Sequence, residues 1–130
     1  MDRKKILIVD DEKDVLSVLE RGLTAEGYSV ITAGTGHDAV MLAKSEHPDL
    51  IILDLLMPNM EGTEVAAILR EDSETEDIPV IFLTGLLEKE DEKRQGHVIG
   101  GNIFIAKPYE ILTLINMIEN VLLEKQISLK

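Results

Sequence analysis

The sequence has 130 residues, of which 13 are lysine or arginine and 25 are aspartate or glutamate, so the formal net charge is −12. A chain of this length forms a single domain with a hydrophobic core. The negative charge disfavours direct binding to nucleic acid or to an anionic membrane, because both depend largely on lysine and arginine. The absence of cysteine excludes disulfides, thiol catalysis and thiolate metal sites.

The sequence carries no pattern of a targeting or membrane segment. Its start, MDRKKILIVDDE, has too few consecutive apolar residues for a secretory signal peptide. No apolar run approaches the roughly 20 residues of a membrane helix. We therefore expect a cytoplasmic protein with one domain over residues 1–125 and a short tail over residues 126–130.

Five short apolar runs, rich in β-branched residues, predict β-strands: Ile6–Val9, Ser29–Thr32, Leu50–Leu53, Val80–Leu83 and Ile103–Ile105. Strands that are apolar throughout are typical of parallel sheets with helices on both faces. The intervening segments mostly show the apolar spacing of amphipathic helices.

Helices are predicted at four places: Glu12 to about Glu26, His37–Glu46, about Gly62–Glu71, and Tyr109 to about Lys125. A further segment, Glu88–Gln95, contains no apolar residue, and we expect it to form a weakly packed helix. Strands and helices then alternate along the whole chain. This alternation predicts an α/β fold of the (βα)5 type, a doubly wound parallel sheet.

Five polar residues stand where predicted strands end: Asp10 and Asp11 after the first strand, Asp54 after the third, Thr84 after the fourth and Lys107 just beyond the fifth. Each residue alone has an ordinary structural interpretation, as a helix cap, a strand residue or a surface charge. Sites in open parallel sheets, however, form at the carboxyl ends of the strands. We therefore expect the five side chains to lie together, and the crowded carboxylates to require a cation.

Mg²⁺ is the cation that suits these side chains, because it prefers oxygen ligands and binds through carboxylates together with water and phosphate. The three histidines are far apart in the sequence, so a site for a softer metal is not predicted. Lys107 and Thr84 offer a positive charge and a hydroxyl to a phosphoryl group. Asp54 is the candidate nucleophile that would accept this group as an acyl phosphate.

Four segments resemble the receiver domain of bacterial two-component response regulators: ILIVDDE at 6–12, DLIILDLLMPNMEG at 49–62, PVIFLTG at 79–85 and AKP at 106–108. The resemblance covers about residues 4–124 and implies the flavodoxin-like strand order 2-1-3-4-5. We expect a stand-alone signalling domain, not a turnover enzyme, and the sequence leaves open that it is part of a longer regulator. The phosphoryl group would come from the phosphohistidine of a sensor histidine kinase or a histidine phosphotransfer protein, and the signal would pass to a downstream protein target.

The resemblance also assigns roles to the acidic residues. It implies that Asp54 is the phosphorylated residue and also a ligand of Mg²⁺. Asp11 would bind the metal directly and Asp10 mainly through water, with the backbone carbonyl of Leu56 as a further ligand. A monomer, or a weak dimer formed on phosphorylation, is expected.

The remaining family positions concern the response to phosphorylation. Thr84 and Lys107 would bind the phosphoryl group, and the peptide bond before Pro108 is expected to be cis. Phe104 occupies the family's switch position and, having no hydroxyl, would act through packing. Movement of Thr84 toward the phosphoryl group would make room for Phe104. The change would then reach the face formed by Glu88–Gln95, the fifth strand and the last helix.

The lifetime of the phosphoryl group is expected to be long. The positions two residues after Asp54 and Thr84 carry Leu56 and Leu86. Neither leucine side chain can orient a water molecule for hydrolysis. We therefore expect slow autodephosphorylation, over many minutes or longer.

Other functions fit the sequence less well. Gly34–Ala39 matches the GxGxxA pattern of dinucleotide-binding domains, but that interpretation leaves most of the strand-end residues unexplained. Thr35 is better explained as the N-cap of the second helix. A phosphatase of the haloacid dehalogenase type would carry a second aspartate where Leu56 stands. The sequence leaves open a receiver-like module that binds its partners without phosphorylation.

Overall fold

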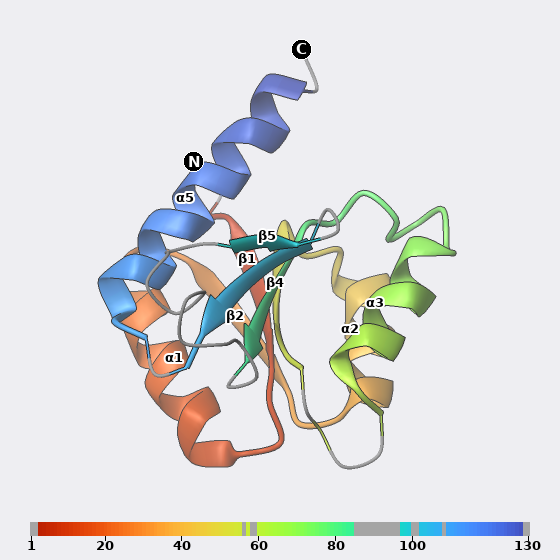
Figure 1. Ribbon diagram of the computed structural model, residues 1–130, viewed down its shortest axis with the longest axis horizontal. Helices are drawn as coiled ribbons and strands as arrows, with labels where there is room; N and C mark the ends of the chain where they lie inside the picture. The colour runs from red at the N-terminus through yellow and green to blue at the C-terminus, as the bar shows by residue number, and fades with distance from the viewer. Residues whose placement is uncertain are drawn as a thin grey trace.

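A computed structural model describes residues 3–55, 57, 60–84, 97–99, 102–107 and 109–128 of the chain. Its strands form one sheet that lies between two layers of helices (Figure 1). Several sequence expectations concern residues outside this described part: Leu56, Leu86, Pro108 and the segment Glu88–Gln95.

The strands of the sheet lie in the order β2-β1-β3-β4-β6-β5. Five of them run parallel: β1 (Lys5–Val9), β2 (Ser29–Ala33), β3 (Leu50–Asp54), β4 (Val80–Thr84) and β6 (Asn102–Ala106). Numbered along the chain, these parallel strands have the order 2-1-3-4-5. The predicted flavodoxin-like arrangement is therefore confirmed.

A short strand at the edge of the sheet, β5 (His97–Ile99), adds to the five predicted strands. It pairs antiparallel with β6, and Ile99 lies opposite Asn102 in the register. The sequence contains a matching signal, because Gly100 and Gly101 separate two short apolar runs in the manner of a β-hairpin. The sheet is thus mixed at this edge and not parallel throughout.

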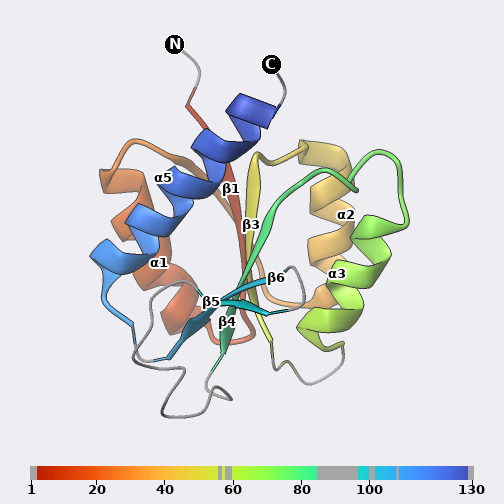
Figure 2. The same cartoon turned by 45° about the horizontal axis from the view of Figure 1, so that its top comes forward.

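Among the described residues, helices α1 (Lys13–Ala25) and α5 (Ile111–Ser128) cover one face of the sheet, and α2 (Gly36–Glu46) and α3 (Gly62–Arg70) cover the other (Figure 2). Their bounds differ from the predicted ones by a few residues at most. Within this described part, no helix has both the length and the apolar character needed to cross a membrane.

Each face of the sheet has its own hydrophobic core. One core joins α1 and α5 to the strand residues Ile6, Ile8, Leu50, Ile52, Ile81, Leu83 and Ile105. The other joins α2 and α3 to the strand residues Leu7, Val9, Ile51, Leu53 and Phe82. Successive residues of one strand therefore face opposite cores, which explains why the strands are apolar at every position.

The segment that resembles a dinucleotide-binding loop is the start of α2. The Oγ1 atom of Thr35 accepts a hydrogen bond from the backbone N–H of Asp38 at 3.1 Å. This contact is an N-cap interaction, which satisfies a backbone donor in the first turn of the helix. The N-cap interpretation of Thr35 is therefore confirmed.

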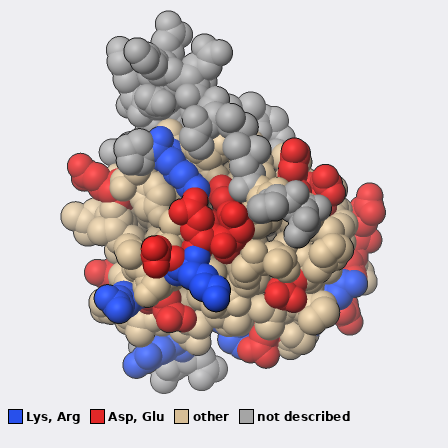
Figure 3. Space-filling view, turned by 90° about the horizontal axis from the view of Figure 1, so that it is seen from below, with Lys and Arg blue, Asp and Glu red and all other residues tan. Residues whose placement is uncertain are grey.

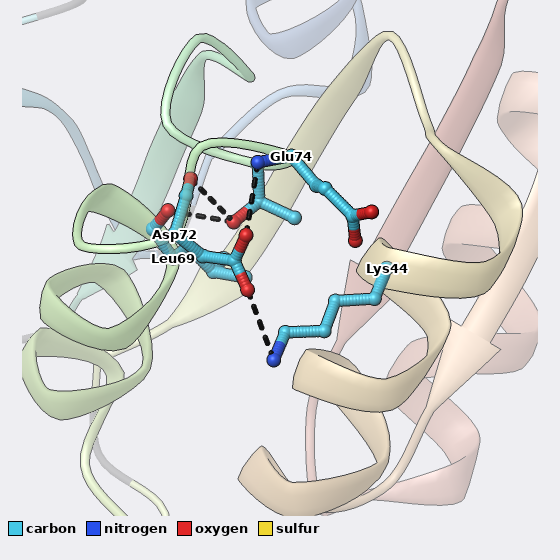
Figure 4. A network of polar contacts seen from close by, with 5 residues as sticks. Lys44, Leu69, Asp72 and Glu74 are labelled. Carbon is cyan, nitrogen blue, oxygen red and sulfur yellow. Dashed lines mark hydrogen bonds and ion pairs between the residues drawn. The ribbon is translucent and has the colours of Figure 1, made fainter.

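A polar network ties α2 to the loop that follows α3 (Figure 4). Nζ of Lys44 lies 3.0 Å from Oδ2 of Asp72, and Oδ1 of Asp72 accepts a hydrogen bond from the backbone N–H of Glu74 at 2.9 Å. Two contacts lower the pKa of Asp72: the hydrogen bond from Glu74 has the larger effect and the contact with Lys44 the smaller. In the same loop, Oγ1 of Thr75 donates to the carbonyl of Leu69 at 2.6 Å. The network fixes the connection from α3 to β4.

Candidate functional site

Three acidic side chains meet at the carboxyl ends of two adjacent strands. Asp54 is the last residue of β3, and Asp10 and Asp11 follow its neighbour β1. One carboxylate oxygen from each residue lies within 4.8 Å of the others. The molecular face in Figure 3 shows acidic side chains gathered beside basic ones near its centre. The structure thus brings the three strand-end carboxylates together.

Lys107 reaches the same carboxylates from the residue after β6. Its Nζ donates a hydrogen bond to Oδ1 of Asp54 at 3.2 Å and lies 3.7 Å from Oδ2 of Asp10. Its backbone N–H donates to the carbonyl of Thr84 at 2.8 Å, which holds this part of the chain against the end of β4. The Lys107 ammonium thus pairs with two of the three carboxylates, those of Asp10 and Asp54.

Asp10 is the most deeply buried acidic residue of the cluster. It is 1% exposed, and its Oδ1 accepts a hydrogen bond from the backbone N–H of Glu12 at 2.9 Å. Its buried Oδ2 accepts no hydrogen bond from any described residue. Burial is the main cause that raises the pKa of Asp10, and the charges of Asp54 and Asp11 raise it further. The Glu12 N–H and Lys107 oppose this shift.

The donor set fits a small, hard divalent cation. A buried carboxylate oxygen without a hydrogen-bond donor is costly unless another partner compensates for it. Asp11 and Asp54 offer carboxylate oxygens within 4.8 Å of an oxygen of Asp10. Oxygen ligands grouped in this way suit Mg²⁺, which takes one or two carboxylates and completes its shell with water or phosphate.

The two other described site residues lie on β4 and β6. Thr84 is the buried last residue of β4, and its register partner is Ala106 at the end of β6. Phe104 lies two residues earlier on β6 and stacks on Phe82 of β4. The structure therefore places Thr84 at the same edge as the carboxylates and Phe104 farther back along the sheet.

Gly62 is a site residue whose role the sequence analysis missed. A Cβ atom at this position would lie 2.6 Å from the backbone oxygen of Asp54, and the Gly62 N–H donates to the carbonyl of Leu55 at 2.9 Å. The first residue of α3 is thus packed directly against the backbone that carries Asp54. Gly62 is the last residue of the segment DLIILDLLMPNMEG, which resembles the receiver family. The sequence alone, however, does not show that the backbone at Gly62 packs against the backbone of Asp54.

Tyr109 also lies near the cluster. Burial raises its pKa to about 12, and the charge of Asp10 adds to the shift, so the phenol stays protonated at neutral pH. Its ring lines an open apolar cavity of about 280 Å³ together with residues of α1: Asp14, Val15, Val18 and Leu19. The sequence analysis used Tyr109 only as the start of a helix.

We expect Asp10→Asn to raise the free energy of unfolding of the metal-free protein by about 1 kcal/mol at pH 7. The substitution removes a buried charge that faces two other carboxylates and keeps an acceptor for the Glu12 N–H. Because the folded-state pKa lies above the ordinary 3.8, ionised Asp10 lowers stability progressively as the pH rises above 3.8. The stability advantage of Asp10→Asn over the wild type should therefore shrink as the pH falls toward 3.8.

Urea unfolding in the presence of a chelator measures this difference. Asp11→Asn is the matched control, because Asp11 belongs to the same cluster but is exposed, and its gain should be smaller. Added Mg²⁺ should stabilise the wild type more than Asp10→Asn. A variant no more stable than the wild type at pH 7 would contradict the account of the Asp10 charge.

Curated relatives of the chain are transcriptional regulators by name. The probable transcriptional regulator ycf27 of Porphyridium aerugineum is 39% identical over 122 residues, which are 94% of this chain and 49% of the relative. The alkaline phosphatase synthesis transcriptional regulatory protein PhoP of Bacillus subtilis is 39% identical over 106 residues, which are 82% of this chain and 43% of that protein. The chain thus spans about half the length of the curated relatives it matches.

These relatives correct the expectation that nucleic acid is not a direct partner. That expectation rested on a net charge of −12 over 130 residues. The relatives are named transcriptional regulators, and about half of each lies outside the matched region. The charge of one domain says nothing of the surface that another part of a protein offers to DNA, so the exclusion drawn from charge is wrong.

Solved structures share the fold over nearly the whole chain. The chemotaxis protein CheY4 of Vibrio cholerae superposes with a TM-score of 0.79 at 31% identity, covering 92% of this chain and 99% of that one. A CheY-like response regulator receiver domain protein of Methanospirillum hungatei gives a TM-score of 0.83 at 27% identity, covering 98% and 99%.

The family model for the response regulator receiver domain matches residues 6–119, which run from the first strand into helix α5. Domains of this family act in two-component signalling, and they generally bind Mg²⁺. The match, the relatives and the shared fold agree with one another. The chain belongs to the response regulator receiver domain family.

Proposed function

We propose that this domain accepts a phosphoryl group on Asp54 and passes the signal on through a change of conformation. The observation that carries the proposal is the position of the Asp54 carboxylate. It lies within 4.8 Å of the Asp10 and Asp11 oxygens and 3.2 Å from Nζ of Lys107. A nucleophile between other carboxylates and an ammonium suits a reaction in which charge must be neutralised.

In this proposal Asp10, Asp11 and Asp54 hold Mg²⁺. The buried Oδ2 of Asp10 supports this assignment, because it accepts no hydrogen bond from a described residue and a cation could bind it directly. When bound, the ion would offset the charge of the carboxylates and of the phosphoryl oxygens. The backbone carbonyl of Leu56 stays a predicted further ligand.

The proposed donor is the phosphohistidine of a histidine kinase or of a histidine phosphotransfer protein. A carboxylate oxygen of Asp54 attacks phosphorus, and the bond between phosphorus and the imidazole nitrogen breaks as the new oxygen–phosphorus bond forms. The electron pair of the broken bond stays on the imidazole. Lys107 would pair with one phosphoryl oxygen, and the hydroxyl of Thr84 would donate to another.

The proposed response involves Thr84 and Phe104. Thr84 would move toward the phosphoryl group and Phe104 would take the space beside it, altering the surface near β6 and α5. Because leucines stand two residues after Asp54 and Thr84, the phosphoryl group would decay slowly.

The named relatives support a second proposal about the protein as a whole. The chain matches about half of two transcriptional regulators. We infer that residues 1–125 form the receiver domain of a regulator that acts in transcription. In that case the downstream target is reached through another part of the same protein.

Acetyl phosphate, a small phosphodonor, tests the phosphoacceptor proposal without a kinase. We expect intact-protein mass spectrometry to show the addition of one phosphoryl group per chain with Mg²⁺ and none with a chelator. Hydroxylamine should remove the added mass, as it does for an acyl phosphate. If no mass is added in the presence of Mg²⁺, the alternative of a module that works without phosphorylation is favoured.

We further expect Lys107→Met to tighten Mg²⁺ binding about tenfold, the order expected when one unit charge is removed from the neighbourhood of a cation. The ammonium that contacts Asp54 and Asp10 competes with the metal for the same oxygens. Isothermal titration measures the affinity. Lys5→Met is the control, because Lys5 pairs with Glu46 at the opposite end of β1. Unchanged or weaker binding would show that Lys107 does not compete with the metal.

A further inference from the structure

The two phenylalanines of the chain stack on each other. Phe82 of β4 and Phe104 of β6 are register partners, with ring centroids 5.1 Å apart and ring planes inclined by 20°. Phe82 is 1% exposed and belongs to the core beneath α2 and α3, whereas Phe104 is partly buried against that core. One ring of the pair is therefore held by packing, and the other lies at the margin of the core.

One face of β4 leads from this pair to Thr84, at the edge of the sheet where Asp54 also lies. Thr84 follows Phe82 by two residues, so both side chains lie on one face of β4. The register partner of Thr84 is Ala106, which has no side-chain atom beyond Cβ. On β6, the residue beside Thr84 therefore has only a small side chain. Phe104 is the diagonal neighbour of Thr84, at a separation that an aromatic side chain can span.

We propose that Phe82 is a positioning residue for the switch: its buried ring holds Phe104 away from Thr84 and thereby stabilises the unphosphorylated conformation. This inference rests on the proposed function, in which Thr84 moves and Phe104 follows it. Phe82 is enclosed in the core and does not follow, so the movement of Phe104 breaks the stack. An aromatic pair of this geometry shifts an equilibrium about 2- to 10-fold beyond the effect of the buried area.

Phe82→Leu tests the inference, because leucine keeps an apolar side chain in the core and removes the ring. The probe is beryllofluoride, an analogue of the phosphoryl group, titrated in the presence of Mg²⁺. We expect Phe82→Leu to bind beryllofluoride about 2- to 10-fold more tightly than the wild type. Affinity for Mg²⁺ alone should stay the same, since Phe82 lies in the core beneath α2 and α3 and is not one of the three carboxylate residues.

Ile81→Met is the matched control. Ile81 is the preceding residue of β4, is equally buried, and faces the opposite core beneath α1 and α5. Its substitution should lower stability without changing the beryllofluoride affinity. Should Phe82→Leu fail to fold, Phe82→Met provides a second variant in which a flexible side chain replaces the ring.

Fluorine NMR gives a readout that a purely structural role would not change. With only Phe82 and Phe104 in the chain, fluorophenylalanine labelling yields two signals, and Phe82→Leu leaves that of Phe104 alone. We expect beryllofluoride to shift the Phe104 signal in the wild type. In unliganded Phe82→Leu, this signal should already lie closer to the bound position.

The outcomes separate this inference from the proposed function. Equal beryllofluoride affinity in the wild type and Phe82→Leu would overturn the role of Phe82. A Phe104 signal that does not move when the wild type binds beryllofluoride would also overturn it, while leaving Asp54 as phosphoacceptor. A wild type that takes up neither beryllofluoride nor a phosphoryl group would overturn the proposed function itself.

Discussion

Asp54→Asn is expected to abolish the Mg²⁺-dependent transfer of a phosphoryl group from acetyl phosphate. The amide of asparagine is not a nucleophile toward phosphorus, so loss of the carboxylate removes the attacking atom itself. The oxygen of the amide can still accept the hydrogen bond from Nζ of Lys107, which spans 3.2 Å in the wild type. The fold should therefore persist, and the loss of labelling should come from the missing nucleophile and not from unfolding.

Asp49→Asn provides the control for this experiment. Asp49 directly precedes β3, at the end opposite to Asp54, and its Oδ2 accepts a hydrogen bond from the backbone N–H of Lys5 at 2.7 Å. The control therefore also replaces a carboxylate beside β3, but one far from the cluster. Intact-protein mass spectrometry should show normal labelling of Asp49→Asn and none of Asp54→Asn. Equal labelling of Asp54→Asn and the wild type would place the acceptor on another side chain.

Gly62→Ala is expected to lower the free energy of unfolding by about 2–3 kcal/mol. The new Cβ would lie 2.6 Å from the backbone oxygen of Asp54 and 3.0 Å from Cα of Leu55. Both are backbone atoms, so the contact is relieved only if the end of β3 and the start of α3 move apart. The same movement displaces Asp54, and we expect weaker Mg²⁺ binding as a second effect.

Gly34→Ala is the matched control, because a Cβ at Gly34 would meet no atom within 4 Å. Its stability should equal or slightly exceed that of the wild type. Urea unfolding of the three proteins measures the difference. If Gly62→Ala were as stable as Gly34→Ala, the close approach of α3 to the Asp54 backbone would not be a constraint on the site.

The parallel sheet and the acidic edge could be predicted because both follow from local patterns. Runs such as Leu50–Leu53 are apolar at every position, which is typical of strands buried on both faces. Once the strands are known, the carboxyl-end rule places Asp10 and Asp54 at one edge without knowledge of side-chain positions. In the structure, oxygen atoms of the two carboxylates lie within 4.8 Å of each other, which agrees with that reasoning.

Other features depend on register and close approach, which a single sequence does not reveal. The stack of Phe82 on Phe104 requires that β4 and β6 align those two residues and not their neighbours. The role of Gly62 requires that α3 begin against the backbone of Asp54. Contact with DNA could not be judged from a charge of −12, because that number covers 130 residues and the named regulators are about twice as long.

The separation of the molecule into two cores has a consequence for how such a domain diversifies. Phe82 and Phe104 belong to the core beneath α2 and α3, whereas the cavity between α1 and Tyr109 lies on the other side of the sheet. Substitutions that change the α1 side of this cavity therefore leave the aromatic pair untouched. The outer surface at α1 and the packing of the two phenylalanines are thus free to evolve independently.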